Sequence, residues 1–161
     1  MSSRDINLLT PECKDKCLVM MEYAKEGGLI FGIHWIITCT ARLVKEQIAL
    51  YAQGREPLNL VNRYRKLAGL WPISAEENKR KVTWTLQSKH LIDLDDDVKE
   101  NNLSRAFDIA VVKDKKAIWD LKVSVDDDAI PDYEELASYG KKAGLNCGFY
   151  WKKQDPPHYE V

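Results

Sequence analysis

The chain lacks the segments that mark secreted and membrane-spanning proteins. Its first residues, MSSRDINLLTPECKDK, contain no apolar core of the signal-peptide type. The most apolar run, GGLIFGIHWIITCTARLV, is shorter than the ~20 residues of a membrane helix and contains His34. We therefore expect a protein made in the cytoplasm, with no membrane anchor, and we interpret this run as a buried strand.

The chain has four cysteines but lacks a Cys-x-x-Cys pair, which argues against a zinc ribbon or a redox motif. Cys13 and Cys17 are spaced to share one face of a helix among apolar residues. Small buried side chains are a simpler interpretation of this pair than metal ligands. We expect reduced thiols.

An excess of charge of either sign is also absent. The net charge is −1, so no global field attracts nucleic acid, and we expect no nucleic-acid partner. The basic clusters RYRK (63–66) and NKRK (78–81) are interpreted as solvated surface. With 161 residues and 45% hydrophobic composition, the chain suits one domain, 1–161, and we expect a monomer.

The order of hydrophobic patterns predicts an α+β fold, in which helices pack on a small antiparallel sheet. Helices are predicted from Thr10 to Gly27, over 42–54, over 60–67, and in a segment that ends at Gly144. Strands are predicted for HWIITCTA, KVTWTLQ, LNCGFYW and PHYEV, and for a hairpin formed by AFDIAVV and KAIWDLKV.

Histidine and one aspartate point to a metal site. His34 lies in an apolar strand, where a structural role is favoured, whereas His90 and His158 lie in polar segments and suit zinc. Asp108 interrupts the apolar AFDIAVV. A buried carboxylate there needs a partner or a metal ion. The alternation of the strand equally allows Asp108 to face solvent.

The segment DPPHYEV pairs a carboxylate with a histidine. Asp155 precedes His158 by three residues, and the two intervening prolines restrict the backbone. If His158 binds zinc, Asp155 can act as general base on a zinc-bound water. An ordinary Asp-Pro turn is the alternative.

Three segments resemble, in order, the signatures of the LAS zinc peptidases: TARLVKEQIALYAQGR (40–55), SKH…SRAFDIAVV, and DPPHYEV. This family includes phage endolysins that are L-alanyl-D-glutamate peptidases, and bacterial D-Ala-D-Ala carboxypeptidases. ALYAQGR is more similar to the endolysin branch. The resemblance covers residues 36–161.

The resemblance implies a zinc cleft and a role for each matching residue. Zn²⁺ would be held by His90, Asp108 and His158, with Asp155 as catalytic base. Arg42 would hold substrate and stabilise the developing oxyanion, since a guanidinium is always charged and offers several donors. The matching polar residues that would bind substrate are Ser88 and Gln47, and we expect Arg42 and Gln47 near the start of one helix.

The implied activity is zinc-dependent hydrolysis of a stem-peptide bond in peptidoglycan. The endolysin branch implies an L-alanyl-D-glutamate endopeptidase of a phage or prophage, which leaves the host cytoplasm to act on the cell wall. A D-Ala-D-Ala carboxypeptidase of the same family is the alternative.

The chain departs from the family pattern in two places. His90 and Asp108 are 18 residues apart, much farther than in the family's Ser-x-His-x-x-Gly-x-Ala-x-Asp, and Ser104 replaces the glycine. The extra residues, 91–102, form an acidic loop that either caps the cleft or is solvated decoration. GFYW (148–151) stands where many relatives have Gly-Gly-Asp-Trp.

Two other classes compete with the peptidase. A metal-dependent nuclease would use Asp108 with Asp120 and Lys122 on the next strand, but this leaves Arg42 and His90 unexplained. A non-catalytic wall-binding or phage structural protein on the same fold would need no base, yet Asp155 is present.

Overall fold

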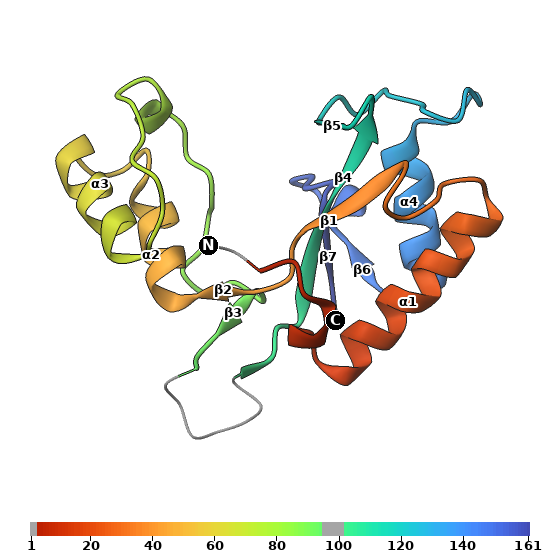
Figure 1. Ribbon diagram of the computed structural model, residues 1–161, viewed down its shortest axis with the longest axis horizontal. Helices are drawn as coiled ribbons and strands as arrows, with labels where there is room; N and C mark the ends of the chain where they lie inside the picture. Colours follow the sequence, from red (N-terminus) through yellow and green to blue (C-terminus); the bar gives the residue numbers. More distant parts are fainter. Residues whose placement is uncertain (1–2, 95–101) are drawn as a thin grey trace.

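The computed structural model describes residues 3–94 and 102–161. The fold is α+β, with helices packed on a small antiparallel sheet (Figure 1), as the sequence predicted. In chain order the elements are α1 (Pro11–Glu26), β1 (Trp35–Cys39), β2 (Arg42–Leu43), α2 (Val44–Ala52), α3 (Leu58–Leu67), β3 (Leu91–Ile92), β4 (Ala106–Lys113), β5 (Lys116–Ile118), α4 (Asp132–Lys142), β6 (Asn146–Cys147) and β7 (His158–Glu160). Short 3-10 helices occupy Ile6–Leu8, Glu77–Lys79 and Gly148–Tyr150.

The main sheet has the order β1-β4-β7-β6, and β5 forms a hairpin with β4. All of these pairings are antiparallel. The register places Asp108 of β4 opposite Cys39 on one side and His158 on the other. A second sheet pairs β2 with β3 in parallel. Asp108 on the central strand β4 therefore lies between Cys39 and His158, two residue types that can bind metal ions.

Helices α1 and α4 pack against each other and cover one face of the main sheet (Figure 1). Thr10 caps α1 by accepting a hydrogen bond from the Cys13 amide, and Pro11 occupies the first turn, as predicted. Cys13 and Cys17 are fully buried free thiols in the core, which confirms their interpretation as core residues. We call this half, with the main sheet, the sheet lobe.

The helices α2 and α3 lie to one side of the sheet lobe and pack on each other (Figure 1). We call residues 44–88 the helical lobe. The segment β1–β2 leads into it, and residues 89–94 lead back. The cleft described below lies between the two lobes.

Several predicted boundaries are wrong. KVTWTLQ (81–87) forms no strand; Val82, Trp84 and Leu86 are all exposed, so its alternation has no buried face and no neighbouring strand to pair with. Gly148–Tyr150 is a 3-10 helix instead of a strand, and β5 ends at Ile118.

His34 lies in a turn before β1, where its Nδ1 accepts a hydrogen bond from the Ile30 amide at 3.0 Å. This placement corrects the strand prediction for His34 and gives it a structural contact. No helix in 3–94 or 102–161 has the length and apolar character needed to cross a bilayer. Of the predicted loop 91–102, residues 95–101 lie outside the described residues.

Candidate metal centre

Three side chains from distant parts of the chain meet at one point between the lobes. His90 lies directly before β3, Asp108 lies on β4, and His158 begins β7. Asp108 and His158 face each other because they are paired in the antiparallel register. The β2–β3 pairing brings His90 to the same place, since the Arg42 amide donates to the His90 carbonyl at 2.8 Å.

The three ligand atoms lie at distances that suit a metal ion. His90 Nε2 and His158 Nδ1 each lie 3.0 Å from Asp108 Oδ1, and 3.2 Å from each other. Tetrahedral zinc with bonds of about 2.0–2.1 Å requires donor atoms about 3.3 Å apart. The residues present therefore fit Zn²⁺ after shifts of only tenths of an ångström.

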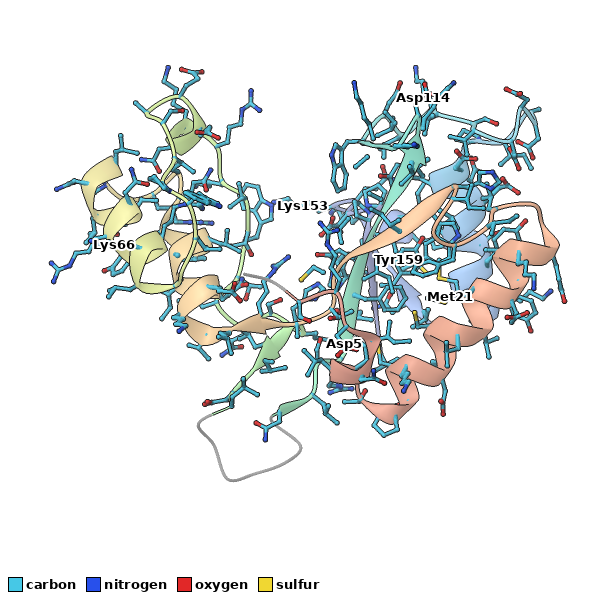
Figure 2. The ribbon with its side chains drawn as sticks, viewed as in Figure 1. Asp5, Met21, Lys66, Asp114, Lys153 and Tyr159 are labelled. Atoms are coloured by element: carbon cyan, nitrogen blue, oxygen red, sulfur yellow. The ribbon has the colours of Figure 1, made fainter. Side chains whose placement is uncertain are left out.

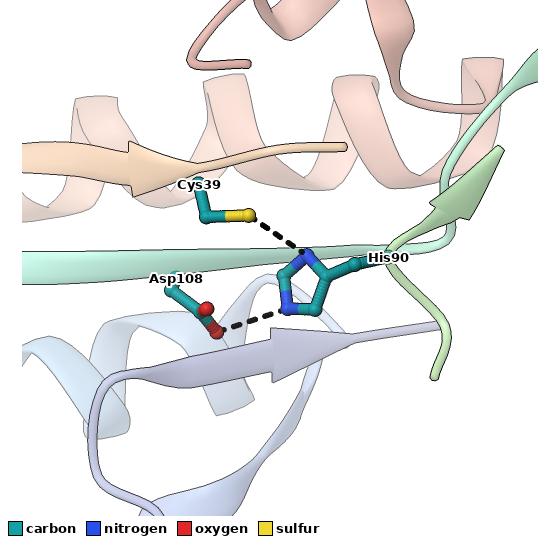
Figure 3. Close-up of side chains that lie close together, drawn as sticks. All are labelled: Cys39, His90 and Asp108. Carbon is teal, nitrogen blue, oxygen red and sulfur yellow. Dashed lines mark hydrogen bonds and ion pairs between the residues drawn. The ribbon is translucent and has the colours of Figure 1, made fainter. Parts of the chain in front are cut away.

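Cys39 offers a second way to bind a metal at this position. One ligand atom from each of Cys39, His90 and Asp108 lies within 4.8 Å of the others, so this group also could hold an ion (Figure 3). The Cys39 thiol faces His90 Nδ1 at 3.7 Å, on the ring edge opposite Nε2. An ion bound at Nε2 meets His158 and Asp108, whereas one at Nδ1 meets Cys39. We favour the first set because His90 Nδ1 also lies 3.4 Å from the Thr40 carbonyl, to which it can donate.

Electrostatics hold this cluster in a charged state. Burial alone would lower the pKa of His90, but the hydrogen bond and charge of Asp108 outweigh it and raise that pKa to about 9. Burial would raise the pKa of Asp108, yet hydrogen bonds from His158 and His90 hold it well below its usual range. The metal-free cluster therefore retains protons that a metal ion must displace.

Glu160 contacts the ring nitrogen of His158 that faces away from Asp108. This residue was not identified from the sequence. Its Oε2 lies 3.1 Å from His158 Nε2, and its Oε1 pairs with Lys89 at 3.1 Å. Burial alone would raise the pKa of Glu160, but these partners outweigh it and keep the carboxylate ionised. Such a carboxylate fixes the tautomer of a ligand histidine. The two-residue spacing on one strand, His158-x-Glu160, is the sequence signal that could have found it.

Arg42 lies in β2, directly before α2, and not in the helix where the sequence placed it. Its guanidinium donates to Asp108 Oδ2 at 3.0 Å and to Gln47 Oε1 at 3.4 Å. Gln47 is buried and in turn donates to Thr83 and to the Thr85 carbonyl. Gln47 thus connects Arg42 to the 81–87 segment and lies behind the cleft wall.

Asp155 and Ser88 both line the cleft beside the cluster. The Asp155 amide donates to the Gly148 carbonyl and its carbonyl accepts from the His158 amide, each at 2.9 Å. Burial raises the pKa of the Asp155 carboxyl above its ordinary value, and the charge of His158 only partly offsets this. Ser88 Oγ accepts from the His90 amide at 3.3 Å, so Ser88 also orients the backbone of a candidate ligand.

The cleft has a volume of about 810 Å³, within the range of small-molecule sites. Beyond the metal cluster it is lined by three tryptophans and by Lys153. Lys153 reaches from the sheet lobe toward the helical lobe (Figure 2), and its ammonium lies 3.0 Å from the centre of the Trp84 ring. The remaining tryptophans of the lining are Trp119 and Trp151.

Of the residues of the nuclease alternative, Asp108 lies in the cluster but Asp120 and Lys122 do not join it. Asp120 and Lys122 are exposed, lie beyond the end of β5, and do not line the cleft. Ser104, which replaces the family's glycine, is fully buried. Its hydroxyl accepts from the Ala106 amide at 3.2 Å and lies 3.1 Å from the Lys89 carbonyl. Ser104 therefore bridges the strand that carries Asp108 and the segment that carries His90.

Comparisons with known proteins relate the chain to others through its fold. No protein-family model and no curated protein sequence matches it. Among solved structures, the crystal structure of Serratia marcescens L-Ala D-Glu endopeptidase ChiX is similar, with a TM-score of 0.54 and 14% sequence identity. The similarity covers 100% of this chain and 88% of that one. The chain thus shares its overall fold with an L-Ala D-Glu endopeptidase.

Proposed function

We propose that the protein is a zinc-dependent peptidoglycan peptidase that hydrolyses the L-alanyl-D-glutamate bond of the stem peptide. The observation that carries the proposal is the convergence of His90, Asp108 and His158 within an open cleft that Arg42 and Asp155 also line. The likeness in fold to an L-Ala D-Glu endopeptidase supports the choice of bond.

In this proposal His90 Nε2, Asp108 Oδ1 and His158 Nδ1 hold the zinc ion. Bound there, zinc would polarise the scissile carbonyl and lower the pKa of a coordinated water to about 7. Glu160 keeps the His158 ring in the tautomer that presents Nδ1 as a ligand. Arg42 holds the second oxygen of Asp108, which fixes the orientation of that carboxylate.

Asp155 moves the proton in the proposed reaction. Its carboxylate accepts a proton from the attacking water and then donates it to the nitrogen of the leaving amine. The raised pKa of Asp155 favours the first half of this transfer, because a less acidic carboxyl is a better proton acceptor. Arg42 stays cationic beside the reacting carbonyl and stabilises its developing negative charge.

The proposed partner, peptidoglycan, fits the walls of the cleft. Stem peptides carry free carboxylates, and Lys89 and Lys153 both line the cleft and can attract them. Ser88 offers a hydroxyl on the same wall. We propose action on the cell wall of a bacterial host after release from the cytoplasm, with the protein acting as a monomer.

Digestion of purified peptidoglycan tests this function. Zinc-loaded protein should release fragments with new amino-terminal D-glutamate, identified by mass spectrometry, and Asp155→Ala should bind zinc normally but lose activity by about 10²–10⁴-fold. Released D-alanine would instead identify a D-Ala-D-Ala carboxypeptidase. Absence of products from several wall types, with zinc in place, would contradict catalysis and favour a wall-binding protein.

A further inference from the structure

A second group of carboxylates does not line the cleft and belongs to α4 and to the segment that joins β5 to α4. Figure 1 shows the course of both segments. One oxygen atom from each of Asp126, Asp128 and Glu135 lies within 4.8 Å of the others. Calcium binds carboxylate oxygens at about 2.3–2.6 Å, so two ligands on opposite sides of one ion are about 4.8 Å apart. The three carboxylates are therefore close enough to share a single ion.

An independent sign of a missing ligand comes from Glu135. The residue is 8% exposed, and its Oε2 is buried with no hydrogen-bond partner among the described residues. Its other oxygen is held by the Tyr139 hydroxyl at 3.0 Å. A buried carboxylate oxygen without a partner is costly, and a bound cation removes that cost.

Asp126 and Asp128, like Glu135, each have one carboxylate oxygen held by a hydrogen bond. Asp126 Oδ1 accepts a hydrogen bond from Ser124 Oγ at 3.2 Å, and Asp128 Oδ1 accepts from the Ile130 amide at 2.7 Å. These bonds fix each carboxylate through one oxygen and leave Oδ2 for a ligand.

The carboxylates of this region have no cationic ion-pair partner in the part of the chain that the structure describes. Among residues 3–94 and 102–161, no lysine or arginine forms an ion pair with Asp126, Asp128 or Glu135. Asp132 adds a fourth carboxylate, which is fully buried and whose Oδ1 has no hydrogen-bond partner within 3–94 and 102–161. Burial raises the pKa of Glu135, and the charges of Asp128 and Asp126 raise it further.

We propose that Asp126, Asp128 and Glu135 form a binding site for a hard divalent cation of the calcium class, separate from the cleft. Carboxylate oxygens without sulfur or imidazole donors favour Ca²⁺ over zinc. The ion joins the loop to the first turns of α4. Asp126 Oδ2 also lies beside the turn after α1, within van der Waals reach of a Cβ placed on Gly28. Bound Ca²⁺ therefore stabilises the sheet lobe.

Calcium titration of the zinc-loaded protein, with trace calcium first removed by a chelating resin, tests this proposal. Calorimetry should show one Ca²⁺ bound per chain without displacement of zinc, measured by elemental analysis. At about 100 times the dissociation constant, Ca²⁺ should raise the unfolding midpoint by about 5–10 °C. The Asp126→Asn/Asp128→Asn variant should lose both the binding and the shift.

The matched control is Asp114→Asn/Asp120→Asn, which removes two exposed carboxylates near the β4–β5 hairpin and should respond to Ca²⁺ like the parent. Without calcium, Asp126→Asn/Asp128→Asn should unfold at or above the midpoint of the parent, because like-charge repulsion is relieved. Absence of one-to-one binding, or an equal shift in both variants, would overturn the proposal. Neither result depends on peptidase activity.

Discussion

In the candidate metal centre, the two ring nitrogens of His90 face different neighbours. Nε2 faces Asp108 and His158, and Nδ1 faces Cys39 and the Thr40 carbonyl. A histidine binds a metal ion through one nitrogen, and the partner of the other nitrogen sets the tautomer. The role of Cys39 therefore follows from which nitrogen binds.

Substitution of single residues distinguishes the two candidate ligand sets, one with His158 and one with Cys39 beside the shared His90 and Asp108. We expect His90→Ala, Asp108→Ala and His158→Ala to remain folded but to bind zinc much more weakly. Removing a residue that only hydrogen-bonds to a metal ligand costs about 10–100-fold in affinity, and removing a ligand itself should cost more. Cys39→Ser should retain one zinc per chain, measured by elemental analysis after dialysis. Loss of zinc in Cys39→Ser with retention in His158→Ala would assign the ion to Cys39, His90 and Asp108.

The prediction of the candidate metal centre came from residue types and their order, because periodicity left it undecided. Asp108 could not be assigned to a face from its strand, since the alternation allowed either side. The structure shows it 17% exposed at the side chain and bonded to both histidines. Cys39 was missed because its strand is apolar and alternates like any core strand, so nothing local marks its contact with a residue 51 positions away.

Among the elements, the 3-10 helix Gly148–Tyr150 controls where Asp155 lies. A Cβ on Gly148 would collide with the Asp155 carbonyl oxygen, and the same two residues share a backbone hydrogen bond. The absence of a side chain at 148 thus allows the loop to fold back and present Asp155 at the cleft.

We expect Gly148→Ala to displace Asp155 while the metal ligands stay in place. Peptidoglycan hydrolysis should fall by about 10²-fold, because small misplacements of a catalytic group are that costly. The free energy of unfolding should drop by about 1–3 kcal/mol from overpacking. Gly69→Ala is the control for destabilisation alone: its Cβ meets nothing, but its positive φ strains a side chain, so this variant should lose stability and keep the parental activity. Gly148→Ala with parental activity would show that the close contact does not position Asp155.

Helix α4 begins with a buried acid that gives a pH-dependent stability. Burial raises the pKa of Asp132 to about 6 from an ordinary value of 3.8; Asp126 and Asp128 add to the shift, and His34 opposes it. Because the pKa of Asp132 is higher in the folded than in the unfolded state, the contribution of this group to the free energy of unfolding is fully present below pH 3.8. That contribution is lost as the pH rises through 6.

Asp132→Asn should remove this loss, since an amide oxygen can still accept from the Val125 amide. In calcium-free buffer, the variant should gain on the order of 1–2 kcal/mol of unfolding free energy relative to the parent from about pH 4 to about pH 7. Urea denaturation at several pH values measures the difference. A constant difference across this range would show that Asp132 does not titrate there.

Element boundaries were predictable where local chemistry decides them. The Thr10-Pro11 start of α1 and the Gly144 stop after α4 depend on capping and on a positive φ, and both were correct. The strand prediction for residues 81–87 was wrong because an alternating pattern does not show whether a partner strand exists. Its conformation is set by Gln47 and Arg55, which bond it from α2 and from the turn that follows.

At the scale of the whole molecule, Trp84 and Lys153 connect two lobes across the mouth of the cleft. Trp84 is 62% exposed, yet it lines the cleft and lies close to Lys153. An exposed indole in this position offers substrate an apolar surface, and Lys153 adds a positive charge beside it.

Trp84→Ala should therefore weaken substrate binding without changing the chemistry. We expect KM for muropeptides to rise by about 3–10-fold, with kcat within about twofold of the parent. Trp71→Ala is the control, because Trp71 is 82% exposed and lies outside the cleft lining. A fall in kcat with unchanged KM would place Trp84 in the catalytic step instead.

The α+β class was predictable because helical and strand-like patterns occupy separate parts of the chain. The arrangement of the two lobes was not, because it depends on contacts such as Lys153 on Trp84 between segments 69 residues apart (153 − 84). Sequence periodicity describes one element at a time and contains no information on how such surfaces meet.

The pairing of Asp108 with His158 across β4 and β7 has a consequence for the detection of relatives. Strand register fixes the separation of these two side chains, whereas the intervals along the chain can lengthen or shorten with little energetic cost. A pattern with rigid gaps would overlook chains such as this one. A more tolerant search would require an Asp and a His on facing strands, a second His beside them, and leave every gap free.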